Sequence, residues 1–136
     1  TTNVFDRSGL PTYLVYPDNK VLTYLAYDSA GRLSRKIDRN AAGTTLTYFN
    51  YTRNANGFPE QVAYEGGAYG YFRYDALDRL TLEQRISSGN AMTYGFYYNY
   101  DADSNRYFKF DAHAASPNAH YYTFDARNRL TSEEQK

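Results

Sequence analysis

Acidic side chains recur along this chain in a way that invites a catalytic interpretation. Two carboxylates that share a site can act as general acid and general base, and aspartates stand at Asp6, Asp28, Asp75, Asp101 and Asp125. Each of them follows an aromatic residue and opens a short polar turn of its own, so the aspartates are separated along the chain. We therefore interpret them as structural residues and not as catalytic pairs.

The two histidines are the other candidates for chemistry. His113 and His120 stand on either side of the segment AASPNA, without a cysteine or a carboxylate at metal-ligand spacing. The sequence also contains no G-x-S-x-G nucleophile motif and no phosphate-binding G-x-x-x-x-G-K motif. We predict a protein that is not an enzyme, with no metal site and no cofactor.

The composition excludes several classes of partner. The chain has 136 residues, with 15 lysines and arginines against 15 aspartates and glutamates, and it has no cysteine. Balanced charge gives no electrostatic attraction to nucleic acid, and apolar runs of only a few residues are too short for a membrane span. The length fits a single domain over residues 1–136. Because the chain starts at Thr1 and not at Met, we expect an excised piece of a longer repeat array.

Seventeen tyrosines and eight phenylalanines favour β-strands. An aromatic landmark recurs after 22, 24, 23, 26 and 24 residues, at Phe5, Tyr27, Tyr51, Tyr74, Tyr100 and Phe124. Each interval has room for two strands and two turns, which predicts one β-hairpin per repeat of 22–26 residues. The expected fold is all-β, with tandem antiparallel hairpins in one continuous, twisted and curved sheet; a small closed β-barrel is the alternative.

A seven-residue motif closes these hairpins, as in YDSAGRL, YDALDRL and FDARNRL. Asp at the second position can bond the backbone two residues on, and Gly, Asp or Asn at the fifth position tolerates a left-handed backbone. A type I turn that ends on a left-handed residue is therefore predicted. The aromatic residue and the arginine should lie side by side across the strand pair, with the guanidinium over the ring. The motif residues are Tyr27, Asp28, Gly31, Arg32, Leu33, Tyr74, Asp75, Asp78, Arg79, Leu80, Tyr100, Asp101, Phe124, Asp125, Asn128, Arg129 and Leu130.

Two copies depart from the motif. The copy at Tyr51, YTRNANGF, has Thr52 where Asp is expected. The copy at Tyr100, YDADSNRY, carries one additional residue before its arginine, which predicts a β-bulge at that hairpin.

The recurring Y-D-x-x-G-R-L motif, together with the stretch YPDNKVLTYLAYD from Tyr16, resembles the YD repeat of the Rhs family over roughly Phe5 to Leu130. That family includes bacterial polymorphic toxins, wall-associated proteins, the B and C components of Tc toxins, and animal teneurins. The resemblance implies a strip of the curved sheet that, in full-length relatives, spirals into a hollow shell around a toxic C-terminal polypeptide. It also implies a secreted or cell-surface location, with neighbouring repeats and the enclosed polypeptide as partners.

The chain departs from the family at one motif. It contains no Asp-Pro dipeptide, so the D-P-x-G motif with which such shells release the toxin is missing. We therefore do not extend self-cleavage to this chain. The expected function is that of a non-catalytic structural repeat segment.

A surface-binding module is the alternative function. In AMTYGFYYNY the period of a strand puts every second residue on one face, including Tyr94, Tyr98 and Tyr100. Exposed tyrosines in a row can stack on sugar rings, so these three form a possible platform for a carbohydrate or cell-surface ligand. The alternative requires that their rings are accessible.

The ends of the chain also predict a partner. Glu133, Glu134 and Lys136 can blunt the last strand as a pairing edge, whereas the segment TTNVF carries no charge that would do so. We therefore expect self-association of the excised chain, most simply as a dimer.

Overall fold

The computed structural model describes residues 2–16, 20–112 and 117–136 of the chain. Residues 17–19, at the centre of the YPDNK stretch, lie outside the described residues. So do His113 and the first half of the segment AASPNA. The described part is almost entirely β-structure, with one short 3-10 turn, η1, at Glu65–Gly67.

Two compact units divide the chain, Thr1–Ala68 and Tyr69–Lys136. The first contains η1 and β1 (Thr2–Phe5), β2 (Pro11–Val15), β3 (Val21–Tyr27), β4 (Leu33–Asn40), β5 (Thr45–Arg53) and β6 (Pro59–Tyr64). The second contains β7 (Tyr69–Tyr74), β8 (Leu80–Ile86), β9 (Met92–Tyr100), β10 (Arg106–Asp111), β11 (Asn118–Phe124) and β12 (Leu130–Gln135).

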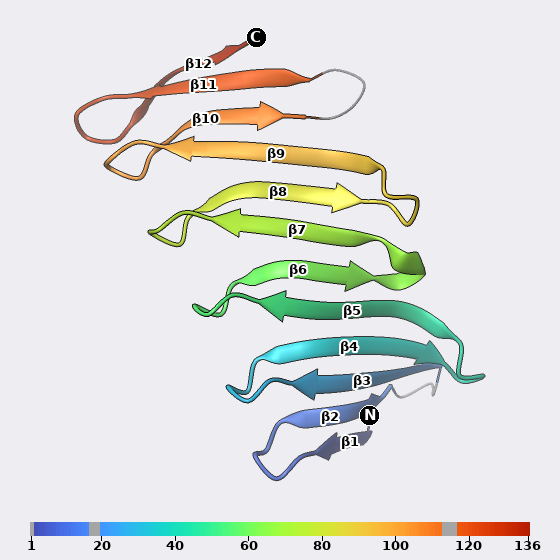
Figure 1. Cartoon of the computed structure of the whole chain (residues 1–136). Helices are drawn as coiled ribbons and strands as arrows, with labels where there is room; N and C mark the ends of the chain where they lie inside the picture. Colours follow the sequence, from blue (N-terminus) through green and yellow to red (C-terminus); the bar gives the residue numbers. More distant parts are fainter. Residues whose placement is uncertain (1, 17–19, 113–116) are drawn as a thin grey trace. The chain divides into compact units, whose positions relative to one another are not determined.

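The strand order follows the sequence from β1 to β12 in an open antiparallel sheet. Within each unit every strand pairs with the strands next to it in sequence, as Figure 1 shows. This topology confirms the all-β prediction of tandem hairpins in a continuous sheet. The alternative of a closed barrel is wrong, because the order is open at β1 and at β12.

Every within-repeat hairpin carries a bulge just beyond its turn. In β7–β8, Tyr74 lies opposite Leu80, and the register then shifts by one residue past Thr81. The same shift occurs at the matching place in the other five hairpins, β1–β2, β3–β4, β5–β6, β9–β10 and β11–β12. The bulge predicted for the copy at Tyr100 therefore exists, but it belongs to all six hairpins and does not come from an additional residue.

The third copy turns two residues later than the sequence indicated. Its loop opens at Asn54, whose N–H donates to the carbonyl of Phe58 at 2.9 Å. Arg53 lies opposite Pro59 and so takes the place of the aromatic landmark, which corrects the assignment to Tyr51. The cause of the error is that residues 51 and 53 lie on the same face of the strand. The spacing of aromatic residues therefore pointed to Tyr51, although Arg53 holds the equivalent position.

The buried core of the first unit is small and partly polar. Thr23, Asp38 and Thr47 lie in one row across β3, β4 and β5, with Thr23 1% exposed. The Asp38 carboxylate accepts hydrogen bonds from both threonine hydroxyls at 2.5 Å and pairs with Lys36 Nζ at 2.8 Å. Burial, the largest single effect, raises the pKa of Asp38, but the bonds from Lys36 and the two threonines together hold it below its ordinary value.

Apolar burial elsewhere is modest. Val62, 5% exposed, is the buried apolar residue among the described residues, whereas the motif leucines Leu33 and Leu80 are half-buried and Leu130 is 55% exposed. Because so little apolar surface is fully removed from water, hairpin geometry and cross-strand contacts carry much of the stability of this fold.

Two loop glycines provide a matched test of this geometry. Gly57 and Gly43 both have a left-handed backbone, with φ of 92° and 85°. A Cβ at Gly57 would collide with the Arg32 guanidinium, whereas a Cβ at Gly43 would meet nothing within 4 Å. We expect Gly43→Ala to lower the free energy of unfolding by about 1 kcal/mol from backbone strain alone, and Gly57→Ala to lower it by about 2 kcal/mol. Urea unfolding of both variants measures the difference, and equal losses would contradict the packing of Arg32 on Gly57.

Candidate functional site: the aspartate loops

One five-residue loop closes hairpins throughout the described residues, and we call it the aspartate loop. In the loop that opens at Asp75, the N–H of Asp78 donates to the Asp75 carbonyl and the N–H of Asp75 donates to the Arg79 carbonyl, both at 3.0 Å. The same pair of bonds occurs in the loops that open at Asp6, Asp28, Asn40, Asn54, Ser87, Asp101 and Asp125. The turns between repeats at Asn40 and Ser87 are thus of the same kind as the motif turns.

The side chain of the first residue in each loop accepts backbone hydrogen bonds that hold the loop closed. Asp75 Oδ1 accepts the backbone N–H groups of Leu77 at 2.9 Å and Arg79 at 3.0 Å. An equivalent oxygen accepts both bonds in the loops at Asp6, Asp28, Asn40, Asp101 and Asp125. The repeated aspartates therefore use a carboxylate oxygen to satisfy backbone donors of their own turns, in the manner of a helix cap.

The fourth residue of each loop has the left-handed backbone that the sequence predicted. Four of these residues are glycines, and the other four are Asp78, Asn90, Ser104 and Asn128, with φ between 59° and 67°. The glycines are Gly9, Gly31, Gly43 and Gly57, with φ between 74° and 92°. Small polar residues and glycine are the types that reach this region at low cost, which explains the composition of the position.

In the loops at Asp28, Asp75, Asp101 and Asp125, the side chain of the fifth residue donates to the second carboxylate oxygen of the aspartate. Arg79 Nε donates to Asp75 Oδ2 at 2.7 Å, and Arg32 and Arg129 make the same bond at 2.8 and 2.7 Å. In the copy at Tyr100, Asn105 takes this role through its amide at 3.0 Å. That copy therefore has a loop of ordinary length in which Asn105 replaces the arginine, and Arg106 is the strand residue opposite Tyr100.

The carboxylates of Asp28, Asp75, Asp101 and Asp125 are held in the charged form. The backbone N–H of the fifth residue is the largest influence that lowers the pKa of Asp28, Asp75 and Asp125. For Asp101 the largest influence is the side-chain amide of Asn105, which also lowers the pKa. A carboxylate that is ionised and bonded to its own loop is a poor general acid or base, so the site geometry favours a structural role.

The predicted pairing of each arginine with the aromatic residue of its own copy is wrong. The register places Leu80, and not Arg79, opposite Tyr74, and it places Leu33 opposite Tyr27 and Leu130 opposite Phe124. The loop bond to Asp75 turns Arg79 toward the next copy, where its guanidinium carbon lies 4.7 Å from the centroid of the Tyr100 ring.

The motif loops of successive repeats touch each other: the fifth residue of one loop contacts the fourth residue of the loop one repeat further on. Sequence reasoning missed this contact. Arg79 Nη1 donates to the Asp101 carbonyl and to Ser104 Oγ, both at 3.1 Å. Asn105 Nδ2 donates to Asn128 Oδ1 at 2.9 Å, which links the next pair of loops. In the first unit the same positions meet by packing, Leu10 against Gly31 and Arg32 against Gly57. The sequence does contain the residues concerned, at the fifth position of one motif loop and the fourth position of the next. That these residues are close in space follows only from the strand register.

Landmark tyrosines add a second link between hairpins. The Tyr27 hydroxyl donates to the carbonyl of Pro11, and the Tyr100 hydroxyl donates to the carbonyl of Leu80, both at 2.8 Å. In each case the acceptor is the first residue of the second strand of the preceding hairpin. This bond gives the tyrosine hydroxyl a role that phenylalanine cannot take.

The predicted ligand platform of Tyr94, Tyr98 and Tyr100 is half-buried. The three rings lie on one face of β9, but Arg106 lies over Tyr98 at 5.4 Å and Arg79 lies over Tyr100. Burial is the largest influence on Tyr98 and raises its pKa. Because cations cover two of the three rings, this face does not offer the bare aromatic surface that the binding alternative required.

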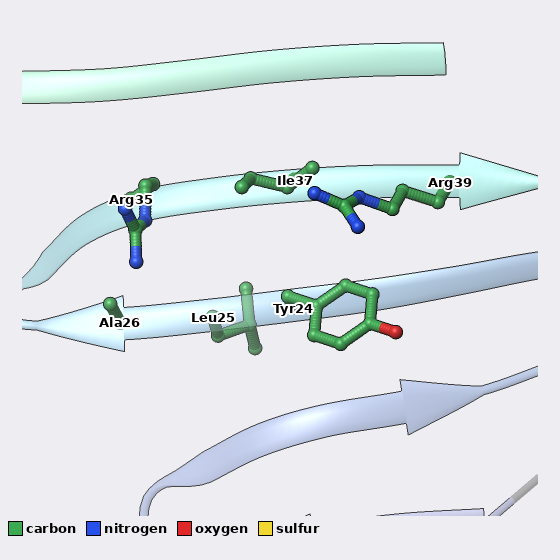
Figure 2. Close-up of a pocket in the computed structure, with 6 residues that line it drawn as sticks. All are labelled: Tyr24, Leu25, Ala26, Arg35, Ile37 and Arg39. Atoms are coloured by element: carbon green, nitrogen blue, oxygen red, sulfur yellow. The ribbon is translucent and has the colours of Figure 1, made fainter. Parts of the chain in front are cut away.

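A pocket on the first unit lies between β3 and β4 and is shown in Figure 2. It is lined by Tyr24, Leu25, Ala26, Arg35, Ile37 and Arg39. The Arg39 guanidinium lies 5.5 Å from the centroid of Tyr24, whose ring also packs on Tyr13 at 4.9 Å. The lining provides two arginines and the phenol of Tyr24, without a carboxylate, thiol or imidazole that could pair with this phenol as acid or base.

Metal-binding groups are sparse in the described residues. No cluster of three histidine, cysteine, aspartate or glutamate side chains that could hold an ion occurs in residues 2–16, 20–112 and 117–136. His120 pairs through Nδ1 with Glu133 Oε1 at 3.0 Å and stacks on Tyr122. Over the same part of the chain, no helix has the length and apolar character needed to cross a membrane.

Comparison with known proteins gives matches at the level of structure. No family model and no curated protein matches the chain. The solved TcdB2-TccC3-TEV chain superposes with a TM-score of 0.85 at 20% sequence identity, and TcdB2-TccC3-Cdc42 with 0.83 at 21%. A Tc holotoxin pore of Photorhabdus luminescens that carries a TccC3 mutation superposes with 0.84 at 20%. Each match covers 96% of this chain. The folds are the same.

The Tc toxin fold confirms the expected resemblance to YD-repeat proteins at the level of architecture. This chain spans only 7% of the first two matched Tc toxin chains and 6% of the third. It therefore corresponds to a short stretch of a Tc toxin sheet, and the activities and partners of the whole proteins are a separate question.

The contact between loops predicts different roles for two arginines of the motif. Arg79 is 22% exposed and touches Asp75, the next loop and Tyr100, whereas Arg129 is 71% exposed and pairs with Asp125. We expect Arg79→Ala to lower the Tm by roughly 4 °C and Arg129→Ala to lower it by about 1 °C. Thermal unfolding followed by circular dichroism compares them. A larger effect at Arg129 would contradict the contact between loops.

The lowered pKa values predict a direction for acid destabilisation. Because Asp28, Asp75, Asp101 and Asp125 have a lower pKa in the folded chain than the ordinary value of about 4, their stabilisation is complete above that value and is lost as the pH falls through the folded pKa values. We expect the Tm to be nearly constant between about pH 5 and 7 and to fall steeply below about pH 4.

An Asp75→Asn variant isolates one of these charges, because asparagine closes the same loop at Asn40. Its Tm should lie below that of the parent chain near pH 6, and the gap should narrow as the pH falls below about 4 and through the lowered pKa of Asp75, because the parent carboxylate then becomes protonated. A gap that is independent of pH would show that the charge of Asp75 does not stabilise the loop.

Proposed function

We propose that this chain is a structural segment of a β-sheet wall, of the kind that forms a shell around a toxin polypeptide in Rhs and Tc proteins. The observation that carries the proposal is the superposition of 96% of the chain on a stretch of TcdB2-TccC3 with a TM-score of 0.85. The use of the repeated aspartates in loop closure supports the same role, because these carboxylates serve the backbone and leave no shared acidic site.

The loop contacts support an array that extends by repetition. In four places the fifth residue of a loop reaches the fourth residue of the matching loop one repeat further on: Leu10 at Gly31, Arg32 at Gly57, Arg79 at Ser104 and Asn105 at Asn128. A contact that recurs with the repeat adds the same stabilisation for every hairpin, as in other repeat proteins. The proposed partners are therefore neighbouring repeats along the sheet and a polypeptide enclosed by the wall.

The edge strands support the self-association expected from the sequence. β1 is exposed along its length, and Val4 and Phe5 are 48% and 55% exposed. β12 is also exposed, but Glu133 and Glu134 place charge on it. We propose that β1 pairs with a second copy when the chain is isolated, and light scattering across a concentration series measures this. A non-enzymatic role and a secreted or cell-surface location complete the proposal, and both follow from the same resemblance.

A chimaera tests the wall function. The aligned 96% of this chain would replace the stretch of TcdB2-TccC3 on which it superposes, in a protein that keeps the hypervariable C-terminal region. We expect the chimaera to form particles of the parent size and to protect that C-terminal region from added protease. Electron microscopy and the fraction of C-terminal region that survives digestion are the two measurements.

A matched control separates the wall from mere tolerance of an insertion. The control chimaera carries Asp75→Ala and Asp101→Ala, which remove the side chains that close the motif loops of two successive repeats. It should protect the C-terminal region less well than the first chimaera. Equal protection by both would contradict a wall that depends on the aspartate loops, and digestion of the C-terminal region in assembled particles of the first chimaera would contradict the wall function itself.

A further inference from the structure

An open groove on the second unit has no part in loop closure. It is lined by Tyr97, Asn99, Phe108, Phe110 and Ala112. These side chains share one face because the register of β9 and β10 pairs Tyr97 with Phe110 and Asn99 with Phe108. They lie on the face of β9 opposite to Tyr98 and Tyr100, since alternate residues of a strand point to opposite faces.

Among the aromatic rings of this groove, Tyr97 is exposed, and Phe108 and Phe110 are half-buried. Tyr97 is 40% exposed and packs on Phe110 with the ring centroids 6.1 Å apart. Phe108 packs on Tyr121 at 5.2 Å, and Lys136 lies over Tyr121 at the border of the groove. Within the described part of the chain no cation lies over Tyr97, in contrast to Tyr98 on the other face, which is covered by Arg106. β9 therefore has one face on which Tyr98 and Tyr100 are covered by arginines and one on which the ring of Tyr97 is accessible.

The groove also presents neutral hydrogen-bonding groups beside its rings. The amide of Asn99 is exposed. Gln84 Nε2 donates to the Tyr97 hydroxyl at 3.1 Å, so the proton of that hydroxyl is directed to another acceptor. None of the five lining residues is charged. A ligand that fits this lining is uncharged, carries its own donors and acceptors, and has a flat apolar face for the rings.

We propose that this groove binds a neutral oligosaccharide. The C–H face of a sugar ring stacks on Tyr97 or Phe108, and its hydroxyl groups satisfy Asn99 and the Tyr97 hydroxyl. An apolar peptide side chain fits less well, because it would remove the amide and the hydroxyl from water without a hydrogen bond in return. This binding site is additional to the wall function and lies on the face opposite to the tyrosines that the sequence suggested.

Titration of the intact chain with maltohexaose, cellohexaose and chitohexaose tests the proposal. Amide chemical shifts in ¹H–¹⁵N spectra report binding, and we expect saturable shifts centred on β9 and β10 for at least one probe, with a Kd of about 1 mM or lower. Tyr97→Ala should weaken the affinity at least about tenfold and Asn99→Ala about tenfold, since each removes one contact of the kind described.

The chain offers a matched control in Tyr107. This tyrosine is 42% exposed, similar to Tyr97, but it does not line the groove. Tyr107→Ala should leave the affinity unchanged, and circular dichroism confirms that each variant keeps its strands. Absence of saturable shifts with all three probes at about 10 mM would overturn the proposal. So would equal weakening by Tyr107→Ala and Tyr97→Ala.

A peptide arm separates the two classes of ligand. An uncharged ten-residue peptide of leucine, serine and glycine is titrated under the same conditions. Saturable binding of this peptide at β9 and β10 without binding of any sugar would overturn the oligosaccharide proposal in favour of polypeptide docking. Neither result bears on the protease protection of the chimaera, so the groove and the wall function can fail separately.

Discussion

The left-handed fourth residue of each aspartate loop is the constraint on which the rest of the structure depends. It brings the N–H of the fifth residue back to the side chain of the first, where an oxygen of Asp75 or its equivalents accepts it. The loop geometry leaves a bulge beyond the turn, and the bulge fixes the register of the hairpin. Since a slip of one residue would exchange the two faces of a strand, this local geometry also decides which side chains share a face.

The arginine of the motif shows how a local bond becomes a link between repeats. In Arg79 the Nε is committed to Asp75 of its own loop, which leaves Nη1 to donate to groups outside that loop. In Arg79 this orientation reaches the next loop and the ring of Tyr100. One planar side chain with several donors can make all of these contacts, which a lysine could not. The same bonds occupy both oxygens of the Asp75 carboxylate with donors from its own loop.

The dependence on loops gives a physical reason for a shared fold at 20% identity with the TcdB2-TccC3-TEV chain. Few residues are deeply buried, so close packing of a large core does not fix the side chains. The fold requires a side-chain oxygen that accepts hydrogen bonds at the first loop position, and a residue that tolerates positive φ at the fourth position. The residues on the strand faces are less constrained by the loops. The two faces of β9, one covered by arginines and one accessible, show how different such faces can be.

The sequence alone determined the all-β class, the hairpin of each repeat and the left-handed turn residue, because these follow from local residue types and from period two. The loop role of Asp28, Asp75 and Asp125 was predictable for the same reason. The partner of Arg79, the landmark at Arg53 and the role of Asn105 were not, because each depends on which residues the strand register brings opposite one another. Tertiary structure also decided which tyrosines are accessible: period two separates Tyr97 from Tyr98, but only the positions of Arg106 and Arg79 show which face is covered.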